Sequence, residues 1–168
     1  MKLVISEAAM AEILADLREQ IDALDSQLVD MLTARLELSH KVSAAKTDTG
    51  HIFRPAREAQ MLTRLLADAP AGLQPLIPVV WRAIISSSIA EQRPNFTIAA
   101  SAQMRDIATN FSAGQLNLEI FDSADAGLQA LATEKADIVL VSPAELLNLA
   151  PRLGEDETAL VIARMQLV

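Results

Sequence analysis

The stretch LREQIDALDSQLVDMLTARLELSHKVSAAK, residues 17–46, decides the fold of the first half of this chain. It contains no glycine or proline, and its apolar residues recur every three or four positions, which predicts one long amphipathic helix. We expect this helix to begin near Ser6, a good N-cap residue, and to end near Lys46, before the polar run 47–50. The apolar series comprises Leu14, Leu17, Ile21, Leu24, Leu28, Met31, Leu38, Val42 and Ala45.

One position in this apolar series carries a charge. Arg35 stands where an aliphatic residue is due, and burying an unpaired charge costs on the order of several kcal/mol, so we expect an anion to meet it. Lys46 follows 11 positions later on the same helix face, about 16 Å along the axis, so both cations could converge on a small dianion. Arg18 lies about 25 Å from Arg35 and could reach that site only from a second, antiparallel copy. The alternative for Arg18 is an exposed, salt-bridged arginine.

The length of this helix bears on assembly. About 40 residues span roughly 60 Å, whereas a compact domain of 93 residues has a radius of gyration of about 12 Å. Two shorter helices cannot cover so long an apolar stripe, which predicts an intertwined homodimer. The alternative is a coiled-coil tether.

Composition narrows the class of protein. The 168 residues are 51% apolar and 21% charged, with no cysteine and two histidines, so disulfides and thiolate metal sites are excluded and a histidine metal centre is not expected. The N-terminus lacks a signal-peptide core and no apolar run is long enough to span a membrane, which predicts a cytoplasmic protein. The net charge of −8 argues against a nucleic-acid partner. Residues 1–93 hold 10 Lys+Arg against 12 Asp+Glu (−2), and residues 94–168 hold 4 against 10 (−6), so a site for an anion should lie in the first half.

The rest of the chain predicts two kinds of structure. A helix should begin near Pro55 and end near Asp68, and another should begin around residues 75–78 and end near Gln92. After Pro94 strands and helices alternate, which predicts a small, mostly parallel α/β unit. The fold class is therefore α+β in two parts, a helical domain at residues 1–93 and a βαβαβαβ unit at residues 96–168. Strands are expected at 96–100, 116–121, 137–141 and 160–168, and helices at 102–111, 123–133 and 143–149.

Further polar residues could serve a site in the helical part. Ser88 and Gln92 are four positions apart and share a helix face. Arg54, Arg57 and Glu58 gather at a helix N-terminus, where backbone amides already favour anions. Both groups could equally be ordinary surface residues.

Three segments together resemble the all-α class of chorismate mutase. They are residues 17–46 quoted above, FRPAREAQMLTRL at 53–65 and IISSSIAEQ at 84–92, and the resemblance covers residues 10–92, about half of the chain. It implies an intertwined homodimer of three-helix protomers that rearranges the dianion chorismate to prephenate, without a nucleophile, metal or cofactor.

The resemblance also implies roles for particular residues. The expected roles are as follows: Arg18 crosses the dimer, Arg35 and Ser88 bind carboxylates, Lys46 and Gln92 bond the ether oxygen, Glu58 binds the hydroxyl, and Arg57 is its partner at the start of the helix. A glutamine at position 92 donates at any pH, so no acid-requiring step is expected there. Two departures stand out: Arg54 replaces an acidic residue found in some members, and Pro78 is tolerable only in the first turn of its helix.

The second half of the chain has a less specific resemblance to a known family. Residues 123–145, SADAGLQALATEKADIVLVSPAE, faintly resemble the first lobe of prephenate dehydratase. The Thr-Arg-Phe signature of that enzyme is absent, so we expect a degenerate or truncated unit without dehydratase activity. Two alternatives for the whole chain stay open: an isochorismate pyruvate-lyase on the same helical scaffold, and a non-catalytic regulatory or dimerisation module.

Overall fold

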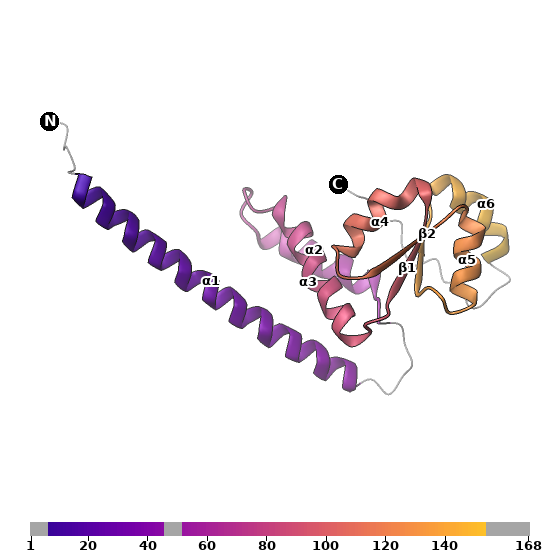
Figure 1. Ribbon diagram of the computed structural model, residues 1–168, viewed down its shortest axis with the longest axis horizontal. Helices are drawn as coiled ribbons and strands as arrows, with labels where there is room; N and C mark the ends of the chain where they lie inside the picture. Colours follow the sequence, from indigo (N-terminus) through magenta and orange to yellow (C-terminus); the bar gives the residue numbers. More distant parts are fainter. Residues whose placement is uncertain (1–6, 46–51, 154–168) are drawn as a thin grey trace. The chain divides into compact units, whose positions relative to one another are not determined.

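The computed structural model describes residues 7–45 and 52–153, and the chain divides into two compact units, residues 1–47 and 48–168. The first unit is one continuous helix, α1 (Glu7–Ala44), drawn in indigo and purple in Figure 1. The predicted long helix is therefore confirmed, since nothing in its sequence interrupts the hydrogen-bond ladder. None of its described residues is buried, and its apolar stripe is exposed, with Leu24 at 58% and Leu38 at 60%.

The second unit begins with a helical hairpin. Pro55 opens α2 (Pro55–Asp68), where its missing N–H costs nothing. Tight turns follow, in which the Leu73 amide donates to the Pro70 carbonyl at 2.8 Å. Then α3 (Leu76–Gln92) begins, and Pro78 is its third residue. Both predicted helices are thus confirmed, and Pro78 lies in the first turn as its chemistry requires.

A small parallel sheet follows the hairpin. Its strand order is β2-β1-β3 and both strand pairs are parallel, which confirms the predicted α/β character. Ser123 caps the second crossover helix as predicted, its Oγ accepting from the Ala126 amide at 3.2 Å. The helix expected at 102–111 instead forms two pieces, and the strand expected at 160–168 lies outside the described residues. The elements are β1 (Thr97–Ser101), η1 (Ala102–Met104), α4 (Arg105–Ser112), β2 (Asn117–Phe121), α5 (Ala124–Ala132), β3 (Ile138–Leu140) and α6 (Pro143–Leu153).

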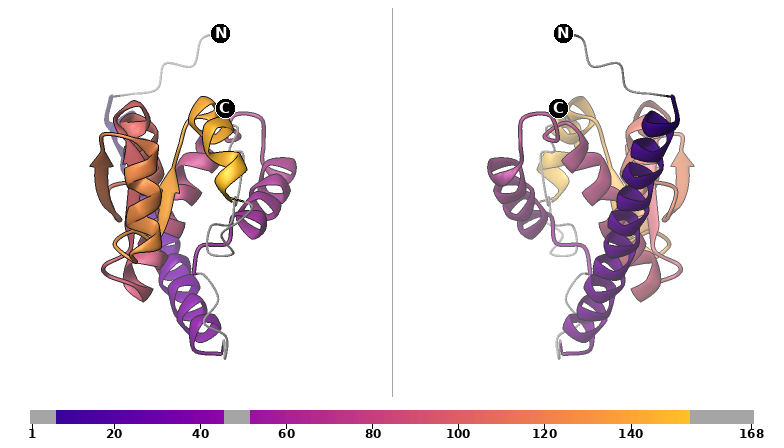
Figure 2. Two further views of the ribbon diagram at one scale, coloured as in Figure 1. Left: turned by 90° about the vertical axis from the view of Figure 1, so that its right-hand side faces the viewer. Right: turned by 90° about the vertical axis from the view of Figure 1, so that its left-hand side faces the viewer.

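The central strand β1 separates two cores. Ile98 and Ala100 pack with residues of α3 and α4, whereas Ala99 packs with residues of α5 and the loop before β3. Successive side chains of a strand point to opposite faces, so α3 and α4 cover one face of the sheet and α5 the other. Figure 2 shows α5 alongside the strands. Gly127 allows this close approach, because a Cβ there would lie 3.1 Å from Cγ1 of Val139.

Packing is continuous from the hairpin to the sheet. Ile85 and Ile89 of α3 share one hydrophobic core with residues of β1, α4 and β3. Where α3 ends, Arg93 forms an ion pair with Asp137 at 2.7 Å, and the other oxygen of Asp137 accepts from the Thr97 amide at 2.7 Å. The sequence predicts a domain boundary between residues 93 and 96, where the sequence pattern changes, and this boundary stays a prediction. One hydrophobic core contains residues from both sides of it.

Candidate functional site

The predicted site residues fall in three groups. Arg18 and Arg35 belong to α1, in the first unit. Lys46 lies outside the described residues. The remaining members belong to the hairpin of the second unit: Arg57 and Glu58 in α2, Ser88 and Gln92 in α3.

The two arginines of α1 differ in exposure. Arg18 is exposed, as are its helical neighbours. Arg35 is half-buried, and this burial lowers the pKa of its guanidinium from the ordinary value. Even so, an arginine remains charged at any physiological pH. Arg35 is therefore a partly desolvated cation, as predicted for a charge in the apolar series of this helix.

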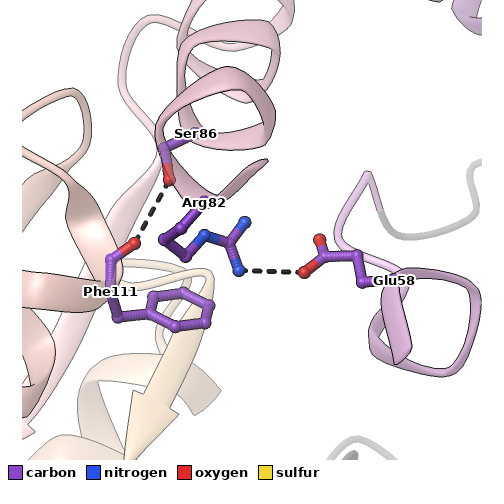
Figure 3. Close-up of polar contacts among 4 residues, drawn as sticks. All are labelled: Glu58, Arg82, Ser86 and Phe111. Carbon is purple, nitrogen blue, oxygen red and sulfur yellow. Dashed lines mark hydrogen bonds and ion pairs between the residues drawn. The ribbon is translucent and has the colours of Figure 1, made fainter. Parts of the chain in front are cut away.

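Glu58 has the most distinctive environment in the hairpin. Its side chain is 16% exposed, and its Oε2 accepts a hydrogen bond of 2.9 Å from Nη1 of Arg82, in α3 (Figure 3). Burial raises the pKa of Glu58 above its usual value, and the attraction and hydrogen bond of Arg82 offset only part of that rise. Among the described residues, Oε1 of this carboxylate has no hydrogen bond. Glu58 can therefore accept a further hydrogen bond from a ligand.

Arg82 was missed by sequence reasoning. Its side chain is 17% exposed, and its guanidinium carbon lies 4.4 Å from the centre of the Phe111 ring, in α4. Its Nε and Nη2 are buried without a hydrogen-bond partner among the described residues. A signal for the pair was present: a hairpin that turns near residue 70 places positions 58 and 82 opposite each other, and Arg82 is the one charge in the run LIPVVWRAIISSS.

Ser88 and Gln92 lie on the shared face of α3, as their spacing predicts. Ser88 is buried, and its Oγ donates to the Ile84 carbonyl at 2.9 Å. Gln92 is half-buried, and its Nε2 donates to the Ser88 carbonyl at 3.0 Å. Side chains so fixed against their own helix are held in defined positions. At the other end of the hairpin, Arg54 and Arg57 are exposed at the start of α2.

The carboxyl edge of the sheet holds a second polar cluster. Glu145 is the third residue of α6 and its Oε2 accepts from the Ser142 amide at 2.7 Å, while Ser142 Oγ accepts from the Glu145 amide at 3.2 Å, forming a capping box. Ser101, at the end of β1, also donates to Oε2 at 3.2 Å. Partial burial would raise the pKa of Glu145, but these hydrogen bonds outweigh it and lower the pKa. The carboxylate thus lies where β1 and β3 end, the place at which strand order reverses and where ligands bind in open α/β sheets.

No helix in the described part of the chain is both long and apolar enough to cross a membrane. Within the same residues, no group of three or more histidine, aspartate or glutamate side chains is arranged to hold a metal ion.

Comparison with known proteins relates the helical segment to a protein family. Residues 17–93 match the family model described as chorismate mutase type II. The chain is 34% identical over 110 residues to the T-protein of Enterobacter agglomerans, covering 64% of this chain and 29% of that protein. It is 30% identical over 147 residues to the T-protein of Haemophilus influenzae, covering 78% of this chain and 39% of the relative.

A third relative is a bifunctional enzyme. The bifunctional chorismate mutase/prephenate dehydratase of Neisseria gonorrhoeae is 32% identical over 90 residues, covering 52% of this chain and 24% of that protein. No solved structure matches. The chain thus spans less than two-fifths of the length of these relatives. The resemblance predicted for residues 10–92 is confirmed over residues 17–92, a segment that includes all seven predicted site residues.

Proposed function

Because residues 17–93 match the chorismate mutase type II family, we propose that this chain rearranges chorismate to prephenate, in aromatic amino-acid biosynthesis. The observation that carries the proposal is this match over a segment containing every predicted site residue, from Arg18 to Gln92. The reaction is an intramolecular shift within a dianion. It needs no nucleophile, proton shuttle, metal or cofactor, and so the residues have only to select the compact conformer and stabilise charge on the breaking ether oxygen.

The proposed roles divide between binding and stabilisation of charge. Arg35 and Ser88 bind carboxylates of the substrate, with Arg18 added from a second copy. Lys46 and Gln92 donate to the ether oxygen as negative charge develops there. Glu58 orients the hydroxyl, and Arg57 lies beside it at the start of α2. The half-buried carboxylate of Glu58, whose Oε1 can still accept a hydrogen bond, supports its role.

We also propose that the active form is a homodimer. The support is the surface of α1, a helix of 38 residues, about 57 Å long, along which large apolar side chains are exposed. A contiguous apolar surface of this kind marks an interaction site on a soluble protein. A second copy is the occupant that gives Arg18 a role in the site. The cytoplasmic location predicted from the sequence belongs to this same proposal.

For residues 96–168 we propose a non-catalytic role. The support is the carboxyl edge of its sheet, where Glu145 and Ser101 bond each other and a helix terminus. The purified chain is expected to leave prephenate undehydrated.

The mutase proposal is tested by following the loss of chorismate spectroscopically with the purified chain. Arg35→Ala and Lys46→Ala should each lower kcat/KM, Lys46→Ala by about 10²–10³-fold, because it removes a donor to developing charge. Arg64→Ala, at an exposed arginine of α2, is the matched control and should change little.

Two outcomes would overturn this proposal. If wild type converts chorismate no faster than the Arg35 and Lys46 variants, the chain is not a mutase, and a regulatory or dimerisation module remains. If it instead releases pyruvate and salicylate from isochorismate, the chain is a lyase on the same scaffold.

A further inference from the structure

The environment of Arg82 joins the helical segment to the α/β unit. Of its guanidinium nitrogens, Nη1 donates to Glu58, whereas Nε and Nη2 are buried without a partner among the described residues. Hydrogen bonding alone therefore does not account for its position. The face of the Phe111 ring lies 4.4 Å from its guanidinium carbon, which is the geometry of a cation–π contact (Figure 3). Arg82 is held between an anion from α2 and a ring from α4.

Phe111 is itself fixed from two sides. Its ring meets that of Phe53 edge-on, with centroids 5.5 Å apart and an interplanar angle of 83°. Its main-chain carbonyl accepts from Oγ of Ser86, one turn of α3 beyond Arg82, at 3.2 Å. The ring under the guanidinium is thus a rigid support, and it comes from the α/β unit.

We propose that Arg82 is a positioning residue for Glu58, and that the α/β unit, through the ring of Phe111, holds Arg82 where it fixes one carboxylate oxygen and leaves the other to the substrate. This inference rests on the proposed mutase function and deepens it, since it gives residues 96–153 a part in the same site. The α/β unit then needs no chemistry of its own to influence the reaction.

Arg82 should act on Glu58 in two ways. The hydrogen bond to Oε2 restricts rotation of the carboxylate, so that Oε1 is presented in one direction. The positive charge also favours the ionised form of a carboxyl whose pKa is raised by burial. A residue that only packed in the core would do neither, and this difference makes the proposal testable.

The test compares Arg82→Met, Arg82→Lys and Phe111→Leu with two matched controls. Arg64→Met removes an exposed arginine from α2. Phe53→Leu removes a ring from the same cluster but leaves Phe111 beneath Arg82. For each protein the titration of the Glu58 side-chain carboxyl is followed by ¹³C NMR, and kcat and KM are measured across pH.

The expected results have a clear order. In Arg82→Met the carboxyl of Glu58 should titrate at higher pH than in wild type, and kcat/KM should fall on the order of tenfold to a hundredfold. Arg82→Lys should restore part of both, because it keeps the charge without the fork of the guanidinium. Phe111→Leu should shift both readouts in the same direction as Arg82→Met but less. Phe53→Leu should shift them less than Phe111→Leu, because it keeps the ring beneath Arg82 and removes only a neighbour of that ring. Arg64→Met should match wild type.

Contrary results are equally defined. If Glu58 titrates at the same pH in Arg82→Met as in wild type, the proposal is wrong. If Arg82→Met does not fold, Arg82→Lys and Phe111→Leu decide by the same titration. If Phe53→Leu has the same effect as Phe111→Leu, the ring acts only through packing, and the part assigned to the α/β unit is lost. Should wild type turn over no chorismate, the proposed function fails, yet the titration still shows whether Arg82 governs Glu58.

Discussion

Ser86 of α3 donates a hydrogen bond of 3.2 Å from its Oγ to the main-chain carbonyl of Phe111, in the last turn of α4. Ser86 is fully buried. The last carbonyls of a helix have no partner within it, so this hydroxyl satisfies a group that would otherwise be buried and unpaired. One bond thereby links the helical segment that carries the site residues to the α/β unit.

Ser86→Ala should therefore destabilise the second unit. The Phe111 carbonyl would lose its partner in a dry core, at a cost of about 1–3 kcal/mol in the free energy of unfolding. Urea denaturation followed by Trp81 fluorescence measures this directly. Ser87→Ala is the matched control, because Ser87 is half-buried and has no side-chain hydrogen bond among the described residues. Equal midpoints for the two variants would contradict the assignment.

Glu58 should give the proposed activity an acid limit. Burial raises the pKa of this carboxyl above the ordinary 4.5, and Arg82 offsets only part of the rise. The substrate hydroxyl needs the ionised form as acceptor, so kcat/KM should fall as pH decreases through the raised pKa, above pH 4.5. Glu58→Gln should lower kcat/KM and abolish that limb of the profile.

The same shift has a consequence for stability. A carboxyl whose pKa is raised by folding binds its proton more tightly in the folded state, so its contribution to stability is present at low pH and is lost as pH rises through the folded pKa. The deficit in unfolding free energy of Glu58→Gln relative to wild type should therefore shrink between pH 4 and pH 7. A deficit that grows over this range would show that the pKa of Glu58 is lowered instead.

The exposed stripe of α1 should hold the proposed dimer together. Leu24 is 58% exposed in the single chain, and Leu24→Glu would place a charge in the interface between two copies, where burial is costly. Light scattering should report twice the chain mass for wild type and the chain mass for the variant. Gln27→Glu, at an exposed polar position of the same helix, should remain dimeric. A wild type that scatters as a single chain contradicts the dimer.

Arg18 and Arg35 should complement each other between subunits. If each site takes Arg18 from one copy and Arg35 from the other, mixing inactive Arg18→Ala and Arg35→Ala proteins would create heterodimers with one intact site. After subunit exchange, about a quarter of the wild-type activity should return. Each variant exchanged with itself is the control. No recovery despite confirmed exchange would place both arginines in the site of a single copy.

The sequence alone determined most of the local structure and the family. An unbroken apolar period predicted α1, and prolines and turn residues predicted the ends of α2 and α3. The change of period after Pro94 predicted the parallel α/β unit. The ordered motifs in residues 10–92 predicted a resemblance to a family whose model matches residues 17–93. These features depend on residues that are close together in the chain. Backbone propensity and local hydrogen bonding determine them, so they can be predicted from the residue pattern.

Only the tertiary structure revealed what surrounds Glu58. The Arg82 guanidinium reaches it across the hairpin, and the Phe111 ring reaches Arg82 from an element that the sequence assigned to a separate unit. Nor did the sequence predict that α3 shares a hydrophobic core with the sheet. Contacts of this kind join residues 24 to 29 positions apart, and they are set by how whole elements pack, because the free energy of burying their apolar faces depends on every partner at once.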